Sequence, residues 1–544
     1  MRKAWGTTQA EIVFETEEAM AAAKSKLEGK YVGNQRIWVT DKKANIPKAP
    51  INLPNQELPD IKDVITPWHN VPYETQLQRK SEKIGAIVKQ IVTNLQKEPK
   101  NTWANKVPKF LGIVRSPVET GYRNKTEFTI GYSEDKKPLV GFLLGAAKDG
   151  ILAVGDPSQV PVVPPEHLII KNAIQPYIEK SELVPYQKVT HTGFWRLVIL
   201  RSNRARQHLC TIQVNPVDVA EETITKIQND LIEIAQNIKT EDGTNLIAGL
   251  FIQFHSGVSN AAPHDCPFKK LWGEDIIHED LLGLKFQISP ASFFQVNTAA
   301  TEVLFSAVGD WCKGVHARST ILDICCGTGT IGLTLAKKVG KVYGFELVET
   351  AVKDARKNAT INNISNCEFI AGPAENSLPK ALKNVQTNLP IIGIVDPPRN
   401  GLHAKTIQAI RACPEIETLI YVSCNPDSLV NNAERLCHYT SNTYQGEPFV
   451  LVAAQAYDLF PQTHHVETLA FFRRVSKLDL PLPFSIESET SLTDESQGDK
   501  KIESDENQGD KKIESDENQG DMKIESDIKK EEGTDAGAES MKND

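Results

Sequence analysis

The sequence has few of the features that mark membrane, secreted or metal-binding proteins. No apolar run approaches the roughly 20 residues that a helix needs to cross a bilayer. The N-terminal stretch Met1-Arg-Lys-Ala-Trp-Gly has no hydrophobic signal core. The nine cysteines follow no regular framework, and no four of them have zinc or iron–sulfur spacing. We therefore expect a protein of a reducing compartment, without membrane contact and without a bound metal.

The net charge of −9 is unevenly distributed along the chain. The segment from Pro481 to Asp544 holds 8 lysines and 20 acidic residues, whereas the rest has 53 basic and 50 acidic residues and carries +3. A slightly basic folded part leaves nucleic acid open as a partner without implying it. Within the acidic segment, an eleven-residue unit begins at Gln497 and recurs from Gln508 and, altered, from Gln519. Each unit has too few apolar residues to build a core, so we predict that residues 476–544 are disordered.

Residues 1–42 predict a small module of two strands with a helix between them. The strands are expected over Gln9–Phe14 and Asn34–Val39, and the alanine-rich helix over Glu17–Leu27. This order resembles the second half of an RNA-recognition motif, which stacks bases on aromatic side chains of its third strand. Polar residues take the matching positions here, so we expect a partial module that does not stack bases.

The next two segments are predicted to be a linker and a mixed domain. Prolines are frequent in residues 43–75, which predicts an extended linker. Residues 76–285 are expected to form a helix from Gln76, then an α+β domain of short strands with one helix over about Ala220–Ile238. The run Gly121-Tyr-Arg-Asn-Lys-Thr-Glu-Phe128 mixes basic and aromatic residues. It favours either nucleic-acid contact or an edge strand with solvated charges.

Residues 286–475 alternate apolar strand patterns with helical patterns, which predicts an α/β domain built on a doubly wound parallel sheet. In such a sheet, ligands bind beyond the carboxyl ends of the strands. The predicted strands are 321–324, 341–346, 391–395 and 418–423, and the predicted helices are 331–338, 350–362 and 406–412.

A glycine-rich motif follows the first of these strands. Gly327-Thr-Gly-Thr-Ile-Gly332 matches G-x-G-x-x-G, and Glu346 ends the next strand, where an acid can bind ribose hydroxyls. NAD and S-adenosylmethionine both fit these two features. Asp323 ahead of the glycines favours S-adenosylmethionine. The alternative is that the glycines serve only the packing of a strand–turn–helix unit.

The stretch Asp396-Pro-Pro-Arg399 follows the predicted strand at 391–395. Its two prolines remove backbone donors and stiffen the loop. We therefore expect Asp396 to face a cofactor or a substrate base, although an Asp-Pro pair is also common in ordinary turns.

Cys424 is the candidate nucleophile. It follows the buried strand Thr418-Leu-Ile-Tyr-Val-Ser423 and precedes Asn425-Pro426. A cysteine is most often a small buried apolar residue. This cysteine is expected on the same edge of the sheet as three acids, where a thiolate can attack a substrate: Asp323, Glu346 and Asp396.

A thiolate beside a methyl donor has a specific use in pyrimidine chemistry. Carbon 5 of uracil is a poor nucleophile, but addition of a thiolate at carbon 6 forms an enolate and makes carbon 5 reactive. After methyl transfer, a base must remove the carbon 5 proton before the thiol can leave. Glu467 suits that role, because its apolar neighbours in a predicted strand over 466–472 would raise its pKa. The alternative is a surface or salt-bridged glutamate.

These motifs together resemble the RNA 5-methyluridine methyltransferases over about Val107 to Arg474. The resemblance implies a Rossmann-like, S-adenosylmethionine-dependent methyltransferase domain preceded by an α+β RNA-binding domain. Five stretches in the order of the family carry it: Phe293-Phe-Gln-Val-Asn297, Asp323-Ile-Cys-Cys-Gly-Thr-Gly329, Asp396-Pro-Pro-Arg-Asn-Gly401, Ser423-Cys-Asn-Pro426 and His465-Val-Glu467.

The resemblance also implies roles for individual residues. Cys424 would be the nucleophile and Glu467 the proton acceptor. Cys325 stands where the family often has an aromatic residue. The residues implied to contact S-adenosylmethionine are Gln295, Cys325, Glu346 and Asp396. Those implied to help hold RNA are Tyr122, Arg123 and Phe128.

The resemblance favours tRNA as the partner. The bacterial ribosomal-RNA branch of the family has a cysteine iron–sulfur motif and an N-terminal barrel, and neither is found in this sequence. The implied product is ribothymidine in the T-loop, whose uridine is buried in the tRNA elbow and must be flipped out. We expect a monomer in the cytosol, with the nucleus also open.

Other functions are compatible with parts of the pattern. Methylation of cytosine at carbon 5 usually needs a cysteine in the Asp-Pro-Pro region, and residues 394–401 contain none. An NAD oxidoreductase would have no use for Cys424 and Glu467. Methylation of a uridine in another RNA fits the same motifs. A protein that binds RNA or assists assembly without methylating it is a different class. Methyl transfer that is lost in Cys424→Ala separates an enzyme from such a protein.

Overall fold

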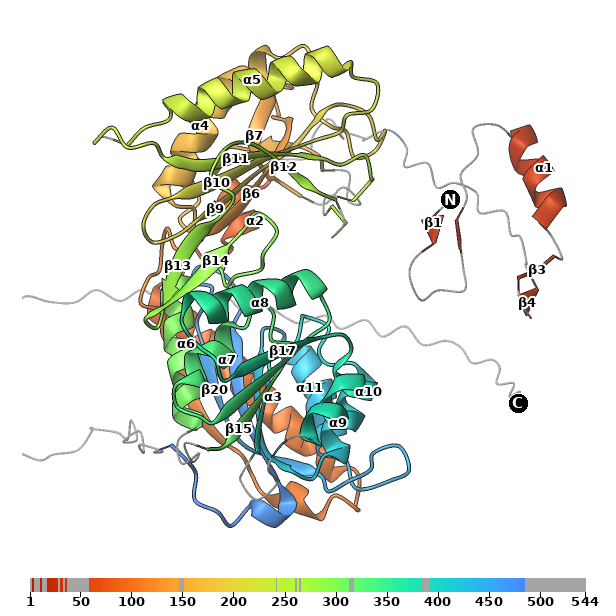
Figure 1. The fold of residues 1–544 in the computed structure, drawn as a ribbon, viewed down its shortest axis with the longest axis vertical. Helices are drawn as coiled ribbons and strands as arrows, with labels where there is room; N and C mark the ends of the chain where they lie inside the picture. Colours follow the sequence, from red (N-terminus) through yellow and green to blue (C-terminus); the bar gives the residue numbers. More distant parts are fainter. Residues whose placement is uncertain are drawn as a thin grey trace, which may run out of the picture. The chain divides into compact units, whose positions relative to one another are not determined.

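The C-terminal half is built on an eight-stranded sheet, which we call the C-terminal sheet (Figure 1). The computed structural model describes residues 2–3, 10–11, 17–27, 30–32, 35–36 and 58–484, except for 146–150, 241, 260–261, 264–265, 313–317, 384 and 386–390. The strand order is β17-β16-β15-β18-β19-β21-β20-β5. The bounds are β5 Lys109–Val114, β15 Thr320–Ile324, β16 Lys341–Glu346, β17 Cys367–Ala371, β18 Ile391–Val395, β19 Ile416–Ser423, β20 Phe449–Tyr457 and β21 Glu467–Arg474.

The expected parallel sheet is found for five strands, but the complete sheet is mixed. Strands β17, β16, β15, β18 and β19 are parallel neighbours. Strand β21 runs antiparallel to both β19 and β20, which corrects the prediction of a wholly parallel sheet. The reason is the short connection over 458–466, because a parallel crossover needs a dozen or more residues.

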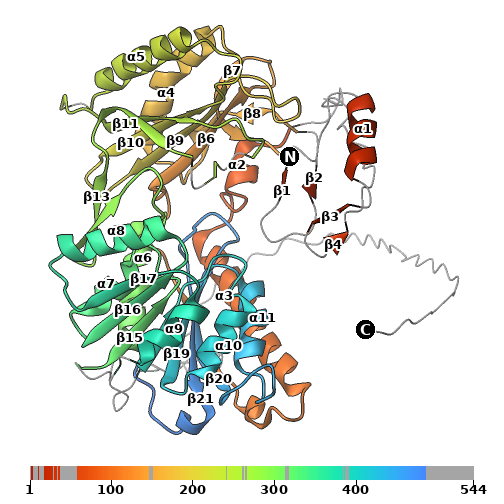
Figure 2. The same cartoon turned by 45° about the vertical axis from the view of Figure 1, so that its right-hand side comes forward.

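Helices cover both faces of the C-terminal sheet (Figure 2). One face packs against α6, α7 and α8, through apolar residues such as Leu304, Leu333 and Val352. The other face packs against α3, α9, α10 and α11, through residues such as Ile84, Ile407 and Leu429. The bounds are α3 Tyr73–Gln96, α6 Thr298–Trp311, α7 Thr330–Ala336, α8 Glu349–Ile361, α9 Ala374–Leu382, α10 Ala404–Ala412 and α11 Pro426–Leu436. The predicted strands and helices of this region are thus confirmed to within a few residues.

Helix α3 packs on the C-terminal sheet, although we expected it to belong with the central domain. Its apolar stripe lies in the same core as residues of β20 and α11. Strand β5, which follows it, pairs with β20 at the sheet edge. The predicted unit over 76–285 is therefore divided, because its first part belongs to the C-terminal sheet. Local periodicity predicted the helix but carried no information about which sheet it would cover.

The central domain has a seven-stranded sheet with α4 and α5 in one layer over it (Figure 1). Helix α5 confirms the helix predicted over about Ala220–Ile238. Helix α4 was not among the predicted helices, and it contains Pro176, a residue that normally disfavours a helix interior. A hairpin of β13 and β14 follows this sheet. The bounds are β6 Lys125–Tyr132, β7 Pro138–Leu143, β8 Val154–Gly155, β9 Trp195–Ser202, β10 His208–Val214, β11 Ile247–Phe254, β12 Phe268–Gly273, β13 Ile277–Leu281, β14 Leu284–Ile288, α4 Pro165–Lys180 and α5 Glu221–Asn237.

The N-terminal elements do not confirm an RNA-recognition motif. Helix α1 is found over Glu17–Leu27 as predicted. The described strands, however, form two separate antiparallel pairs, β1 with β2 and β3 with β4. Parts of both predicted strands lie outside the described residues. The bounds are β1 Arg2–Lys3, β2 Ala10–Glu11, β3 Tyr31–Val32 and β4 Gln35–Arg36.

Two predictions of irregular chain are partly tested. The short helix α2, Ile61–Ile65, lies within the predicted linker, whose residues 43–57 are outside the described part. Residues 476–484 were predicted to be disordered, but Phe484 stacks on Trp311 with ring centroids 4.6 Å apart. The repeats lie beyond the described residues. Among the described helices, none is both long and apolar enough to span a membrane.

A fully buried arginine connects the end of α10 to the end of α11 and to the segment that follows α11. The Arg411 guanidinium is 0% exposed. It donates to five backbone carbonyls, at distances of 2.5–3.3 Å: those of Arg435, Leu436, His438, Tyr444 and Gly446. Burying a cation costs free energy unless hydrogen bonds compensate it, and these carbonyls provide that compensation.

Replacing Arg411 with methionine should destabilise the fold strongly. The variant leaves up to five inward-facing carbonyls without a donor, so we expect the free energy of unfolding to fall by about 3–5 kcal/mol. Chemical denaturation measures this change. Arg435→Met, at an exposed position on the neighbouring helix, is the matched control and should stay within about 0.5 kcal/mol. Equal effects of the two variants would contradict the role given to Arg411.

Candidate active site

The parallel strands bring the predicted site residues to one edge of the C-terminal sheet, which we call the rim. Ile324 at the end of β15 is paired with Phe345 in β16 and with Val395 in β18. Val395 is paired in turn with Tyr421 in β19. The carboxyl ends of these strands are therefore nearly level. The rim carries four of the predicted residues: Cys325, Glu346, Asp396 and Cys424.

The position of Cys424 is set by the turn between β19 and α11. Asn425 caps α11 by accepting a hydrogen bond from a backbone N–H of its first turn at 3.2 Å. The side-chain amide of Asn425 also donates to the carbonyl of Arg399 at 2.9 Å, which ties the turn to the loop after β18. Cys424 is half-buried at this turn. The structure thus places the predicted nucleophile at a well-defined point on the rim.

Glu467 opens β21 beside Cys424. Ser423 is paired with Thr468 in the antiparallel ladder, so Cys424 and Glu467 occupy the next position along it. Glu467 is 2% exposed, and its Oε2 atom has no hydrogen-bond partner among the described residues. Burial raises the pKa of this carboxyl to about 8, and the negative charge of Asp396 adds to the rise. A carboxyl group with such a pKa can exchange a proton near neutral pH.

The thiol of Cys424 is a weak acid in this structure. Burial, together with the negative charges of Glu467 and Asp396, raises its pKa to about 11. The positive charge of Arg399 acts in the opposite direction. Only about one thiol in 10⁴ is then ionised at pH 7. In the ligand-free structure the Cys424 thiol is therefore mostly protonated at neutral pH.

This pKa predicts how the ligand-free protein reacts with iodoacetamide. Because only the thiolate reacts, alkylation of Cys424 should accelerate about tenfold per pH unit between pH 7 and pH 10. Mass spectrometry of the peptide that contains Cys424 measures the rate. Asp396→Asn removes a negative charge and should raise the rate at pH 8 several-fold. A rate that levels off below pH 9 would contradict the raised pKa.

Asp323 accepts a hydrogen bond from the helix α7 that follows the glycine-rich loop. It is fully buried at the end of β15, and its Oδ2 accepts a hydrogen bond from the backbone N–H of Gly332 at 2.9 Å. Its Oδ1 has no partner among the described residues. Burial raises the pKa of this carboxyl to about 7. One oxygen of Asp323 therefore holds α7 in place, and the other is left without a donor.

Glu346 forms a hydrogen bond with the backbone of the glycine-rich loop. Its two oxygens accept the backbone N–H groups of Gly327 at 3.0 Å and Val348 at 2.9 Å. A carboxylate has about four acceptor positions, so both oxygens can still accept further hydrogen bonds. The residue is only partly covered. Its contact with hydroxyl groups of a ligand stays a prediction.

The backbone of this loop adopts left-handed conformations. Gly329, at the start of α7, has φ 79°, and a Cβ atom there would come within 2.9 Å of the Phe369 ring. Cys325 has φ 64°, which is uncommon for a residue with a side chain. Backbone strain of this kind is often found where a ligand binds. Cys325 remains a predicted cofactor contact on these grounds.

Gln295 lies in the loop between β14 and α6. Its backbone carbonyl accepts a hydrogen bond from the side chain of Asn124 at 2.8 Å, which links the loop to the central domain. Two residues further on, the side chain of Asn297 donates to the carbonyl of Leu459 at 3.2 Å. The Phe293–Asn297 motif thus bridges the central domain and the β20–β21 loop. The contact of Gln295 with a cofactor stays a prediction.

The structure places the basic-aromatic run 121–128 neither on an edge strand nor with its aromatic rings exposed. Strand β6 lies between β7 and β9 and is not an edge strand. Phe128 is 0% exposed and Tyr122 is 8% exposed, so neither ring offers a face to RNA and the prediction that they hold it is wrong. The Tyr122 hydroxyl instead donates to the carbonyl of Pro461 at 3.1 Å. Arg123 is half-buried, and its role in RNA binding stays a prediction.

Sequence reasoning gave no role to Arg399, although it lies in the Asp396-Pro-Pro-Arg399 motif. Its side chain is exposed, and its positive charge opposes the rise in pKa of both Cys424 and Glu467. Arg399 is therefore a cation close to the acids of the rim. Its place in the motif was the signal that could have identified it.

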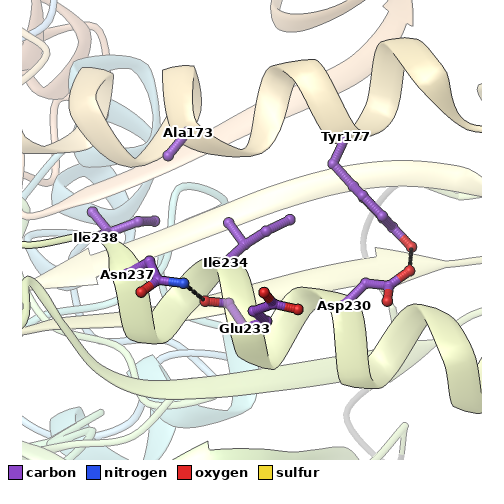
Figure 3. A pocket seen from close by; sticks show the side chains of 7 residues that line it. All are labelled: Ala173, Tyr177, Asp230, Glu233, Ile234, Asn237 and Ile238. Atoms are coloured by element: carbon purple, nitrogen blue, oxygen red, sulfur yellow. Dashed lines mark hydrogen bonds between the residues drawn. The ribbon is translucent and has the colours of Figure 1, made fainter.

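A hollow lined by described residues lies away from the rim, between α4 and α5 (Figure 3). It measures about 440 Å³, and across it the Tyr177 hydroxyl donates to the Asp230 carboxylate at 2.9 Å. None of its lining residues is a predicted site residue. Among the described residues, no three or more histidine, cysteine or acidic side chains are grouped as a metal site.

Comparison with known proteins was made through a family model and through individual relatives. A model described as tRNA (Uracil-5-)-methyltransferase matches residues 274–475. The tRNA (uracil-5-)-methyltransferase homolog A of Homo sapiens is 38% identical over 431 residues, which cover 76% of this chain and 68% of that protein. Homolog B of Mus musculus is 36% identical over 425 residues, which cover 76% of this chain and 85% of that protein.

Among solved structures, the chain is similar to Pyrococcus abyssi tRNA (uracil-54, C5)-methyltransferase in complex with S-adenosyl-L-homocysteine. The TM-score is 0.54 at 23% identity, and the match covers 74% of this chain and 84% of that one. The two proteins share a fold. The α/β architecture with a Rossmann-like domain is thereby confirmed.

Proposed function

Because the chain belongs to the tRNA (uracil-5-)-methyltransferase family, we propose that it methylates carbon 5 of a uridine in tRNA, with S-adenosylmethionine as the methyl donor. The observation that carries this proposal is the position of Cys424 and the buried Glu467 on adjacent strand ends, each one residue beyond the paired Ser423 and Thr468. A nucleophile and a base at neighbouring positions are what carbon 5 methylation requires. By the family resemblance, the target is the T-loop uridine.

The residues of the rim fit S-adenosylmethionine. The unpaired Oδ1 of Asp323 and the open acceptor positions of Glu346 suit a ligand that is rich in hydroxyl and ammonium donors. Several acids with raised pKa values also favour a cationic ligand. When bound, S-adenosylmethionine supplies an electrophilic methyl group on a positively charged sulfur. The residues proposed to hold it are Gln295, Cys325, Glu346 and Asp396.

Cys424 begins the reaction on the uracil ring. Its thiolate bonds to carbon 6, and the electron pair of the carbon 5–carbon 6 double bond moves into an enolate. Carbon 5 is then nucleophilic enough to take up a methyl group. The high pKa of the thiol in the ligand-free site means that attack must follow a change in its electrostatic surroundings. Arg399 is the protein cation placed to assist it.

Glu467 ends the reaction. In its ionised form it accepts the proton from carbon 5, the double bond to carbon 6 reforms, and the Cys424 sulfur leaves as a thiolate. Burial keeps water away from this carboxylate and brings its pKa close to the working pH. The uridine must leave its stack to reach both residues, because neither ring atom is accessible within folded tRNA.

A tRNA transcript with 5-fluorouridine in place of uridine tests this proposal. Fluorine at carbon 5 cannot leave as a proton, so a covalent complex with Cys424 should be trapped and should migrate slowly on a denaturing gel. The shifted band should require S-adenosylmethionine, vanish in Cys424→Ala and survive in Glu467→Gln. A protein that binds the cofactor and tRNA but gives no shift would be a binding or assembly protein, or would act on another RNA. A panel of other RNAs separates these two cases.

A further inference from the structure

The loop between β20 and β21, over 458–466, ends at Glu467 and is held by several distant parts of the chain. Four consecutive backbone carbonyls of this loop each accept a hydrogen bond from another segment. Leu459 accepts from the Asn297 side chain at 3.2 Å, Phe460 from Lys80 Nζ at 3.0 Å, Pro461 from the Tyr122 hydroxyl at 3.1 Å, and Gln462 from the Trp68 backbone N–H at 3.1 Å. A loop on an ordinary hairpin would leave such carbonyls to water.

Helix α3 provides a buried cation for this loop. Lys80 is 0% exposed and forms an ion pair with Asp458, which is equally buried, at 2.6 Å. Asp458 also accepts the backbone N–H of Phe460 at 3.1 Å, so the pair fixes the first turn of the loop. Burial lowers the pKa of Lys80, which shows the cost of removing this charge from water. A buried ion pair is seldom the most stable choice, but it allows few alternative arrangements.

One turn earlier on α3, Gln76 holds the middle of the loop. Its Nε2 donates to Gln462 Oε1 at 3.1 Å, and its Oε1 accepts the backbone N–H of Gln462 at 2.8 Å. Gln462 has φ 69°, a left-handed conformation that a residue with a side chain seldom adopts without support. The amide pair therefore stabilises the point at which the loop reverses towards Glu467.

We propose that Gln76 and Lys80 are positioning residues that hold the β20–β21 loop so that Glu467 faces carbon 5 of the bound uracil. This rests on the proposed function. The two residues lie far upstream of the segment 274–475 that the family model matches. Helix α3 is thus part of the catalytic unit. Gln76 and Lys80 hydrogen-bond to the loop that ends at Glu467. The proton-abstraction step therefore depends on these two residues, whereas the attack by Cys424 on the neighbouring strand end does not.

The test separates the two chemical steps. Lys80→Met should slow turnover on ordinary tRNA by about 10- to 100-fold, because a small misplacement of a base is costly. It should leave the rate of complex formation with 5-fluorouridine tRNA within about threefold of wild type, since that trap needs no base. A covalent complex with ordinary tRNA should accumulate. Gln76→Leu should show the same pattern with a smaller loss, about tenfold.

Two further variants exclude a merely structural effect. Lys89→Met alters an exposed lysine on the same helix and should change neither rate. Lys80→Met combined with Asp458→Asn removes the unpaired buried carboxylate, so thermal stability should recover. Slow turnover should persist, because the Phe460 carbonyl has still lost the hydrogen bond that ties it to α3. If stability and turnover recover together, the role of Lys80 is structural and the proposal fails.

The remaining outcomes are also decisive. Equal loss of complex formation and turnover in folded Lys80→Met or Gln76→Leu would overturn the proposal. If Lys80→Met does not fold, Gln76→Leu provides the test. Its ratio of turnover on ordinary tRNA to complex formation with 5-fluorouridine tRNA then decides whether the proposal holds. If wild-type protein forms no complex with any fluorinated RNA, the proposed function itself fails, and the positioning role fails with it.

Discussion

Replacing Cys424 with alanine should reduce methyl transfer to tRNA by about 10⁴-fold or more. Loss of a nucleophile removes the covalent route completely, and what remains is binding without chemistry. Carbon 5 of uracil cannot take up the methyl group unless a nucleophile adds at carbon 6. Transfer of a radiolabelled methyl group under single-turnover conditions measures the loss. The variant should also form no complex with 5-fluorouridine tRNA.

The control for this result is a second half-buried cysteine that lies away from the rim. Cys367, on β17, is also half-buried, and Cys367→Ala should keep activity within about threefold. S-adenosylmethionine should still bind to Cys424→Ala, because no predicted cofactor contact is lost. Residual activity above about a tenth of wild type would mean that the thiol is not the nucleophile.

The chemistry of the rim could be predicted from sequence because it follows from strand ends. Cys424, Asp396 and Glu346 each directly follow or end an apolar run, and parallel strands bring such residues to one edge. The register confirms this, since neighbouring ends are level. Glu467 fits the same logic in reverse, because it begins an antiparallel strand. A local pattern was sufficient to predict where these residues lie, because each is at the end of a strand and the strand ends meet at one edge of the sheet.

The residues that hold the β20–β21 loop in place could not be predicted in this way. Lys80 and Asp458 form their ion pair across most of the chain, and no local pattern connects them. The periodicity of α3 predicted only a helix and gave no role to Lys80. Tyr122 shows the opposite error, because an aromatic residue in a basic run suggested RNA contact, yet its hydroxyl holds a backbone carbonyl. Long-range hydrogen bonds to backbone carbonyls leave no signature in one sequence.

Replacing Glu467 with glutamine should stop the reaction after methyl transfer. Glutamine cannot accept the carbon 5 proton, so we expect turnover to fall by about 10²- to 10⁴-fold. Complex formation should continue, and ordinary tRNA should become covalently attached to the protein and carry the transferred methyl group. A denaturing gel with a labelled methyl donor shows this directly. The double variant with Cys424→Ala should give no band. An undiminished turnover would exclude Glu467 as the base.

The pH dependence of this step follows from the pKa of about 8 that burial imposes on Glu467. Only the ionised carboxylate accepts a proton, so breakdown of the covalent complex should slow about tenfold for each pH unit below 8 and level off above it. Asp396→Asn removes a neighbouring negative charge, which lowers the pKa of Glu467 and shifts the profile to lower pH. Single-turnover rates between pH 6 and pH 9 measure both profiles. A breakdown rate that does not vary between pH 6 and pH 8 would contradict the raised pKa of Glu467, because a glutamate of ordinary pKa is fully ionised throughout that range.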